Sequence, residues 1–322
     1  MNNLTKNEDI NEQIDPRELF SLLWLNKNFI IIFSLFVSLL AVLYSLSLPN
    51  IYTAKTLIVP SQSSAAPNYG AQYGGLSSMA GITGPISGNN EKLDIALNLI
   101  KSKKLLDRLK QYESFLPNLL AANSWNMKKN TIVYDEKLYN SKDKVWIRNV
   151  SPPFKQIPSS QEALGKFLKL VSISQNTKDQ LITLNVSHVS PVVAQQWSIW
   201  ILNEINDVVA DMDITNSKAS IEYLNEKIST TPYSELKVMF YQLIQEATQS
   251  MMLAEVYPEY VLKTIDPPVI PELKSQPKRS LISILGFLIG GILSILIVIV
   301  RKYILNLDNE LDVFKILRGL RS

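Results

Sequence analysis

Two long apolar runs near the ends of the chain constrain its fold more than any other feature. Phe29 to Leu48 and Leu281 to Val300 are each 20 residues without a charged side chain. As a helix, each run would span about 30 Å, the thickness of the hydrocarbon core of a bilayer. A buried core helix is rarely this long and apolar on every side, and the first run starts too late for a cleaved signal peptide. The sequence therefore predicts two membrane spans, which puts both termini on one side of the membrane.

The basic residues that flank the two spans say little about orientation. Those near the spans in the terminal segments are Arg17, Lys27, Arg301, Lys302 and Lys315, and those at the ends of the intervening loop are Lys55, Lys274, Lys278 and Arg279. Basic residues collect on the cytoplasmic side of a membrane, so the excess of one favours cytoplasmic termini. The charge pattern alone leaves the orientation open.

Composition excludes several classes of function. Because 32 Lys+Arg nearly balance 29 Asp+Glu, the net charge of +3 does not indicate a nucleic-acid partner. The chain has no cysteine and a single histidine, His188, which excludes disulfides, thiolate metal sites, a cysteine nucleophile and two-histidine metal sites. We therefore predict no catalytic residue, no metal and no cofactor, and we do not expect an enzyme.

Two weak matches to catalytic patterns have simpler interpretations. Asp211-Met212-Asp213 fits the short pattern of metal-dependent sugar transferases, but it falls within a helical pattern that points the two carboxylates to different faces. We expect two solvated helix carboxylates. His188 has no acidic neighbour in the sequence and is expected to be a structural or surface histidine.

Strand and helix patterns alternate between the two spans. Strands are predicted at 51–60, 171–175, 181–189 and 260–265, and helices at 17–25, 91–109, 161–170, 191–228 and 234–256. Residues 117–160 are predicted to be irregular. The glycine-rich stretch 61–90 is interpreted as a mobile loop or, alternatively, as a surface that packs on a neighbouring subunit or on the membrane.

The predicted fold is α+β: two transmembrane helices flank one large domain with a membrane-proximal mixed sheet and long protruding helices. The expected boundaries are an N-terminal segment 1–28, a first span 29–48, a domain 49–279, a second span 281–300 and a tail 301–322. The domain ends in a proline-rich lead, 266–279, which is too rich in proline to be helix interior. The long helix from Pro191 suggests packing against other copies of the chain, or a coiled-coil hairpin.

Small residues cluster on one side of the second span. Gly286 and Gly290 form a G-x-x-x-G pattern, and Gly291 and Ser294 extend it. Small residues let two helix backbones approach closely in lipid, so we expect a helix–helix contact here. The first span offers a matching set as the partner face: Ser34, Ser38, Ala41 and Ser45.

Three blocks of residues, in order, resemble the polysaccharide co-polymerase family, the Wzz-type chain-length determinants of bacterial surface polysaccharides. The first block is Ile14-Asp15-Pro16-Arg17-Glu18-Leu19 with Leu23-Trp24, Lys27 and Ile51-Tyr52-Thr53-Ala54. The second is Leu181-Ile182-Thr183-Leu184 with Ser190-Pro191, Ala194, Trp197, 203–206 and 220–224. The third is Met252-Leu253-Ala254 with Glu259-Tyr260-Val261, Ile265-Asp266-Pro267, Pro271-Glu272 and Pro277-Lys278-Arg279.

This resemblance implies an inner-membrane protein with cytoplasmic termini and a periplasmic loop. It implies a ring of protomers, without catalytic activity, that sets the modal length of a glycan made by a separate membrane polymerase. The implied partners are other copies of the chain, that polymerase, its lipid-linked glycan and membrane lipid. The family's second-span motif corresponds to Pro267, Pro271, Pro277, Gly286 and Gly290 with the adjoining Gly291, and a role in assembly and length control is expected there.

The sequence differs from the larger members of this family in a way that indicates one of its subgroups. Those relatives add a cytoplasmic tyrosine kinase domain, whereas this sequence has no Walker A segment and ends 22 residues after Val300. This is typical of the kinase-free subgroup that serves lipopolysaccharide O-antigen. The alternative is a capsule or exopolysaccharide co-polymerase that works in export with a separate kinase and exporter. A two-span periplasmic sensor is a third hypothesis, which the short tail disfavours.

Overall fold

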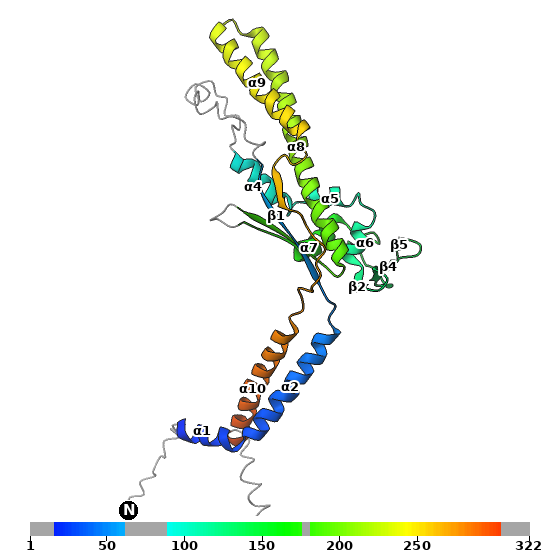
Figure 1. Ribbon diagram of the computed structural model, residues 1–322, viewed down its shortest axis with the longest axis vertical. Coiled ribbons are helices and arrows are strands. Elements are labelled where there is room, and N and C mark those ends of the chain that lie inside the picture. Colours follow the sequence, from blue (N-terminus) through cyan, green and yellow to red (C-terminus); the bar gives the residue numbers. More distant parts are fainter. Residues whose placement is uncertain (1–15, 62–88, 176–180, 304–322) are drawn as a thin grey trace, which may run out of the picture. The chain divides into compact units, whose positions relative to one another are not determined.

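The computed structural model describes residues 16–61, 89–175 and 181–303 (Figure 1). The predicted loop at 61–90 and the predicted tail lie almost entirely outside the described residues. The chain divides into two compact units. One combines the segments up to Leu48 and from Pro277 onward, and the other is the central unit Pro49–Gln276.

The terminal unit contains the helices α1 (Pro16–Leu25), α2 (Lys27–Ser47) and α10 (Arg279–Tyr303). Both α2 and α10 are long and apolar enough to cross a membrane. Their burial pattern is the reverse of a soluble helix pair. The buried side chains of α2 are the serines Ser34 and Ser45, whereas its large apolar side chains point outward. Apolar side chains facing outward along both helices suit a hydrocarbon environment and not water.

A four-stranded sheet organises the central unit, in the order β6 (Val171–Gln175), β7 (Ile182–His188), β1 (Tyr52–Pro60), β8 (Leu262–Asp266). Every neighbouring pair is antiparallel, so the prediction of a mixed sheet is wrong. The reason is the course of the chain. β6 and β7 follow each other closely, and β1 leaves the first apolar helix while β8 leads back toward the second, so adjacent strands run in opposite directions.

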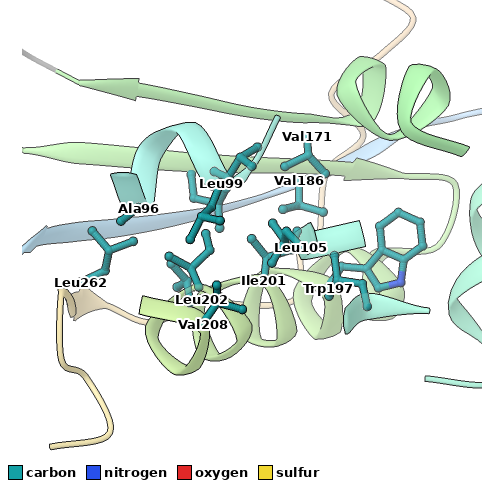
Figure 2. Packing of buried hydrophobic residues seen from close by; sticks show 14 of the residues in the cluster. Ala96, Leu99, Leu105, Val171, Val186, Trp197, Ile201, Leu202, Val208 and Leu262 are labelled. Atoms are coloured by element: carbon teal, nitrogen blue, oxygen red, sulfur yellow. The ribbon is translucent and has the colours of Figure 1, made fainter. Parts of the chain in front are cut away.

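The core lies between one face of this sheet and four helices: α4 (Asn89–Leu99), α5 (Lys103–Leu109), α7 (Ser160–Leu170) and the first half of α8 (Pro191–Thr230). Strand alternation buries every second residue of β7, and these side chains meet the buried stripe of α8 (Figure 2). Trp197 is fully buried and tilts against Phe115 with ring centroids 4.9 Å apart. Trp197 is therefore a core residue.

The predicted helix 91–109 is two helices. Ser102 interrupts it, because its hydroxyl accepts a hydrogen bond from the Leu105 backbone N–H at 3.2 Å and so begins α5. The apolar spacing continues across the break because both helices face the same core. Periodicity alone therefore did not locate the break.

The stretch predicted to be irregular contains structure. A short helix α6 (Phe115–Leu120) leads into the hairpin β2 (Ala122–Asn126) and β3 (Thr131–Tyr134), and then into the hairpin β4 (Tyr139–Asn140) and β5 (Val145–Trp146). The strands are too short to produce a clear alternation in sequence. Their tight turns use positive φ at Asn130 and at Lys144, a non-glycine position that sequence patterns do not mark as a turn.

Helix α8 continues beyond the sheet and turns back as α9 (Ser234–Val256) (Figure 1). The Ser190 hydroxyl accepts from the Val193 N–H at the start of α8, and Pro191 occupies its first turn. Only Thr231 to Tyr233 separate the two helices, which pack on each other as an antiparallel hairpin. Of the two arrangements suggested for this region, the hairpin is present in the single chain.

Candidate functional site in the paired apolar helices and the proline-rich lead

The two apolar helices meet through their small residues, as expected. A Cβ placed on Gly286 would lie 2.6 Å from the Cβ of Ala41. A Cβ on Gly290 would lie 2.9 Å from the Cβ of Val37 and 3.0 Å from the Cα of Ser34. Real Cβ atoms are not found at such separations, so both positions need glycine for the helices to remain this close.

Gly291 differs from the other two glycines. A Cβ there would lie 3.6 Å from the Ser34 hydroxyl, which is an ordinary van der Waals distance. Gly291 is therefore at the margin of the contact, and the expected small-residue set divides into two essential glycines and one replaceable one.

Three serine hydroxyls donate hydrogen bonds to backbone carbonyls along the same seam. Ser38 donates to the Ser283 carbonyl of α10 at 3.2 Å, a direct link between the helices. Ser34 and Ser294 donate to carbonyls of their own helices, at 2.7 Å each. Where water is absent, such bonds remove the cost of a buried hydroxyl, and the seam is polar without being charged.

The predicted proline-rich lead is extended and irregular. Pro267 is exposed and Pro271 half-buried in the central unit, whereas Pro277 belongs to the terminal unit with the glycines. The structure thus separates the predicted motif into a lead and a helix seam. The neighbouring Pro268 is buried, and its carbonyl accepts from the Gln195 side chain of α8 at 2.9 Å.

Sequence reasoning missed the clamp at the end of this lead. The Ile51 N–H donates to the Gln276 carbonyl at 3.0 Å, and the Ser275 N–H donates to the Ile51 carbonyl at 2.8 Å. These backbone bonds hold the chain leaving the first apolar helix beside the chain approaching the second. Because they involve only backbone groups, no side-chain pattern could have revealed them.

The two carboxylates of the weak transferase match point to different partners, as expected, but they are not simply solvated. Asp213 is mostly buried, forms an ion pair with Lys92 at 2.6 Å and accepts from the Tyr260 hydroxyl at 2.6 Å. Burial lowers the pKa of Lys92, but the bonds to Asp213 and Tyr260 outweigh it and hold the pKa above its ordinary value. Asp211 instead pairs with Arg108, at 3.2 Å. Tertiary packing of α4 and α5 against α8 supplies the two basic partners.

His188 is a buried structural residue. Its Nδ1 accepts from the Ser190 N–H at 3.0 Å, so its Nε2 carries the proton and donates to the Asn118 carbonyl at 3.0 Å. Burial lowers the pKa of His188 to about 4, and the imidazole is neutral at pH 7. Within the part of the chain that the structure describes, no cluster of three or more His, Asp or Glu side chains could hold a metal ion.

These features define a class: an α+β domain carried on a close-packed pair of apolar helices that suit a membrane. The family model "Wzz: Chain length determinant protein" matches residues 12–112, so this part of the chain is similar to the family that the sequence blocks resemble.

Two solved structures are distantly similar to the chain. A full-length bacterial polysaccharide co-polymerase is 17% identical, with 91% of this chain and 99% of that chain covered and a TM-score of 0.36. A fragment of WzzB, a polysaccharide co-polymerase from Salmonella Typhimurium, is 14% identical, with 70% and 100% covered and a TM-score of 0.32. At these TM-scores the superpositions carry no weight. No curated protein matches the chain.

Proposed function

We propose that this chain is a non-enzymatic, oligomeric regulator that sets the modal length of lipopolysaccharide O-antigen. The polymer itself would be made by a separate membrane polymerase acting on a lipid-linked glycan. The match of residues 12–112 to the Wzz family model supports the general role in polysaccharide chain length. The choice of O-antigen, the ring of protomers and the polymerase partner are parts of the proposal.

The observation that carries the oligomeric part is an apolar stripe on the outside of α9. Val238 and Tyr241 near its start and Met252 and Val256 near its end lie on one face and are each more than half exposed, while the opposite face of α9 packs on α8. A water-facing helix normally presents polar side chains at such positions. We infer that other copies of the chain cover this stripe, as a multi-copy scaffold requires.

The proposed location is the inner membrane, with α2 and α10 as spans, cytoplasmic termini and a periplasmic central unit. The length and apolar surface of the two helices support membrane insertion. The orientation follows from the resemblance and from the slight excess of basic residues in the terminal segments.

A strain lacking this gene tests the proposal when its surface lipopolysaccharide is separated on a gel, with and without the gene restored. The proposal predicts that the ladder loses its preferred cluster of bands and regains it on complementation. An unchanged ladder would contradict the O-antigen assignment. The alternative, a capsule or exopolysaccharide co-polymerase, predicts instead a changed size distribution of the secreted polymer.

A further inference from the structure

The segment 122–157, here called the hairpin excursion, has an outer surface that does not suit water. Its inner side chains Tyr139 and Trp146 are buried together with Ala121 in a small core. In a short strand the residues on either side of a buried one point outward, and in a solvated hairpin they are polar. Here the residues on either side of Trp146 are Val145 and Ile147, and both are about half exposed.

The same feature recurs across the excursion. Its exposed apolar side chains are Met127 (68%), Val133 (46%), Val145 (51%), Ile147 (47%), Phe154 (56%) and Ile157 (65%). They come from both hairpins and from the loop that follows β5. Single exposed apolar residues need no explanation, but six in one segment of 36 residues indicate a surface that contacts something apolar.

The excursion also concentrates positive charge. It holds seven Lys and Arg against three Asp and Glu, a net charge of +4, whereas the whole chain carries +3. Lys128 and Lys129 lie at the turn of the first hairpin beside Met127, and Lys142 lies at the turn of the second, all exposed. Apolar side chains interleaved with lysines are the pattern of a segment that lies on an anionic lipid surface.

A short chain segment connects the strand that contacts this surface to the first apolar helix. Trp125 of the excursion packs edge-on against Tyr52 at the start of β1, with ring centroids 5.6 Å apart. Tyr52 follows the last residue of α2 by five positions, so its Cα lies within about 18 Å of the end of that helix. A second contact ties the excursion to the same end of the sheet: the Asn118 carbonyl just before it accepts from His188, the register partner of Tyr52.

From this combination we infer that the hairpin excursion binds the headgroup surface of the membrane in which the chain is anchored, with anionic phospholipid as its ligand. Lysines at the hairpin turns contact the phosphates, and the apolar side chains beside them enter the headgroup region. The inference requires the two apolar helices to lie in a bilayer, but it does not depend on the proposed role in polysaccharide length.

The absence of cysteine from the chain makes the test direct. A single environment-sensitive fluorophore is attached to the Met127→Cys variant of the full chain, which is reconstituted in vesicles of phosphatidylcholine with or without phosphatidylglycerol. Lipids carrying a quencher in the headgroup report contact. The matched control is Tyr233→Cys, which is exposed at the far end of α8, about 60 Å along that helix from Pro191.

We expect quenching at position 127 in vesicles that contain phosphatidylglycerol, and none at position 233. The added substitutions Lys128→Glu and Lys129→Glu should reduce the quenched population by about tenfold or more, since each lysine near an anionic surface contributes roughly fivefold. The same charge change at Lys218 and Lys263, which are exposed outside the excursion, should have little effect. Two results would overturn the inference: equal quenching at both positions, or a response at position 127 that follows the protein-to-lipid ratio and not lipid charge. The second would mean that another copy of the chain covers the surface.

Discussion

At the scale of single residues, His188 couples protonation to folding. It is neutral and buried between two backbone groups in the folded chain, and its pKa there is about 4, against an ordinary value of 6.5. Between these two pH values the unfolded chain binds a proton that the folded chain does not. The stabilisation is therefore complete above about pH 6.5 and is lost as the pH falls toward 4, with a total of about 3 kcal/mol.

This predicts an unusual titration that is simple to observe, because His188 is the chain's single histidine. The imidazole signals of the ¹⁵N-histidine-labelled protein should titrate near pH 4 with Nε2 protonated above that value. In the same preparation, the His188→Gln variant should have a lower Tm than wild type at pH 7. Between pH 7 and 4.5, however, its Tm should fall by less than the Tm of wild type. An imidazole that titrates near 6.5 would contradict the burial and bonding described for it.

Asn206 is a second residue with a defined structural role. Its side chain is buried on α8 and holds the start of β8: Nδ2 donates to the Leu262 carbonyl at 3.0 Å, and Oδ1 accepts from the Val261 and Leu262 N–H groups at 2.9 Å each. Replacing it with alanine leaves three backbone groups without this partner, each costing about 1–3 kcal/mol when buried.

We predict that Asn206→Ala lowers the free energy of unfolding of the central unit by about 3 kcal/mol or more. Chemical denaturation followed by tryptophan fluorescence of the full chain in detergent measures this. Asn203→Ala is the matched control, because Asn203 lies one turn earlier on α8 and is exposed. Equal effects of the two variants would show that the Asn206 bonds do not hold β8.

At the scale of elements, the seam between α2 and α10 depends on the absence of two Cβ atoms. Gly286→Ala puts a methyl group 2.6 Å from the Cβ of Ala41, so the helices must separate. The compensating change Ala41→Gly removes the opposing atom and should restore the contact. Gly291→Ala, with 3.6 Å available, should leave the seam intact.

Disulfide formation between cysteines substituted for Ser38 and Ser283 measures how closely the two helices pack. The Ser38 hydroxyl lies 3.2 Å from the Ser283 carbonyl, and the chain has no other cysteine. The expected yield falls several-fold in Gly286→Ala and recovers in the double variant with Ala41→Gly. If the single variant cross-links as well as wild type does, the close packing of the two helices is wrong.

How far the elements could be predicted depended on their length. The apolar runs, the helix 234–256 and the strands of the four-stranded sheet could be recognised in the sequence. Their periodicity and the positions of the prolines extended over many residues. The hairpins of 122–146 were missed because strands of two to five residues leave little or no period, and the break at Ser102 was missed because both helices face one core. In the candidate site, the small-residue seam was predicted from Gly286 and Gly290, whereas the Ile51–Gln276 clamp uses backbone groups alone.

At the scale of the whole molecule, the apolar stripe on α9 predicts assembly. Val238→Glu with Tyr241→Glu places two charges where we expect another copy to pack, and burying unpaired charges at an interface is costly. Mass measurement of the detergent-solubilised protein should show wild type as a large oligomer and the double variant as smaller species. Gln161→Glu, which adds a charge at an exposed polar position of α7, should not change the mass. An unchanged mass in the double variant would place the interface elsewhere.

The central claim is that the chain sets polysaccharide length through the close packing of its two apolar helices. The measurement that tests it most directly is the lipopolysaccharide ladder of a deletion strain that carries wild type, Gly290→Leu or Gly291→Ala at equal membrane levels. The account predicts that wild type and Gly291→Ala restore the modal cluster of bands, and that Gly290→Leu does not, since a side chain there meets Val37 and the Ser34 backbone. A ladder that is the same in the deletion strain and in all three complemented strains would contradict the account.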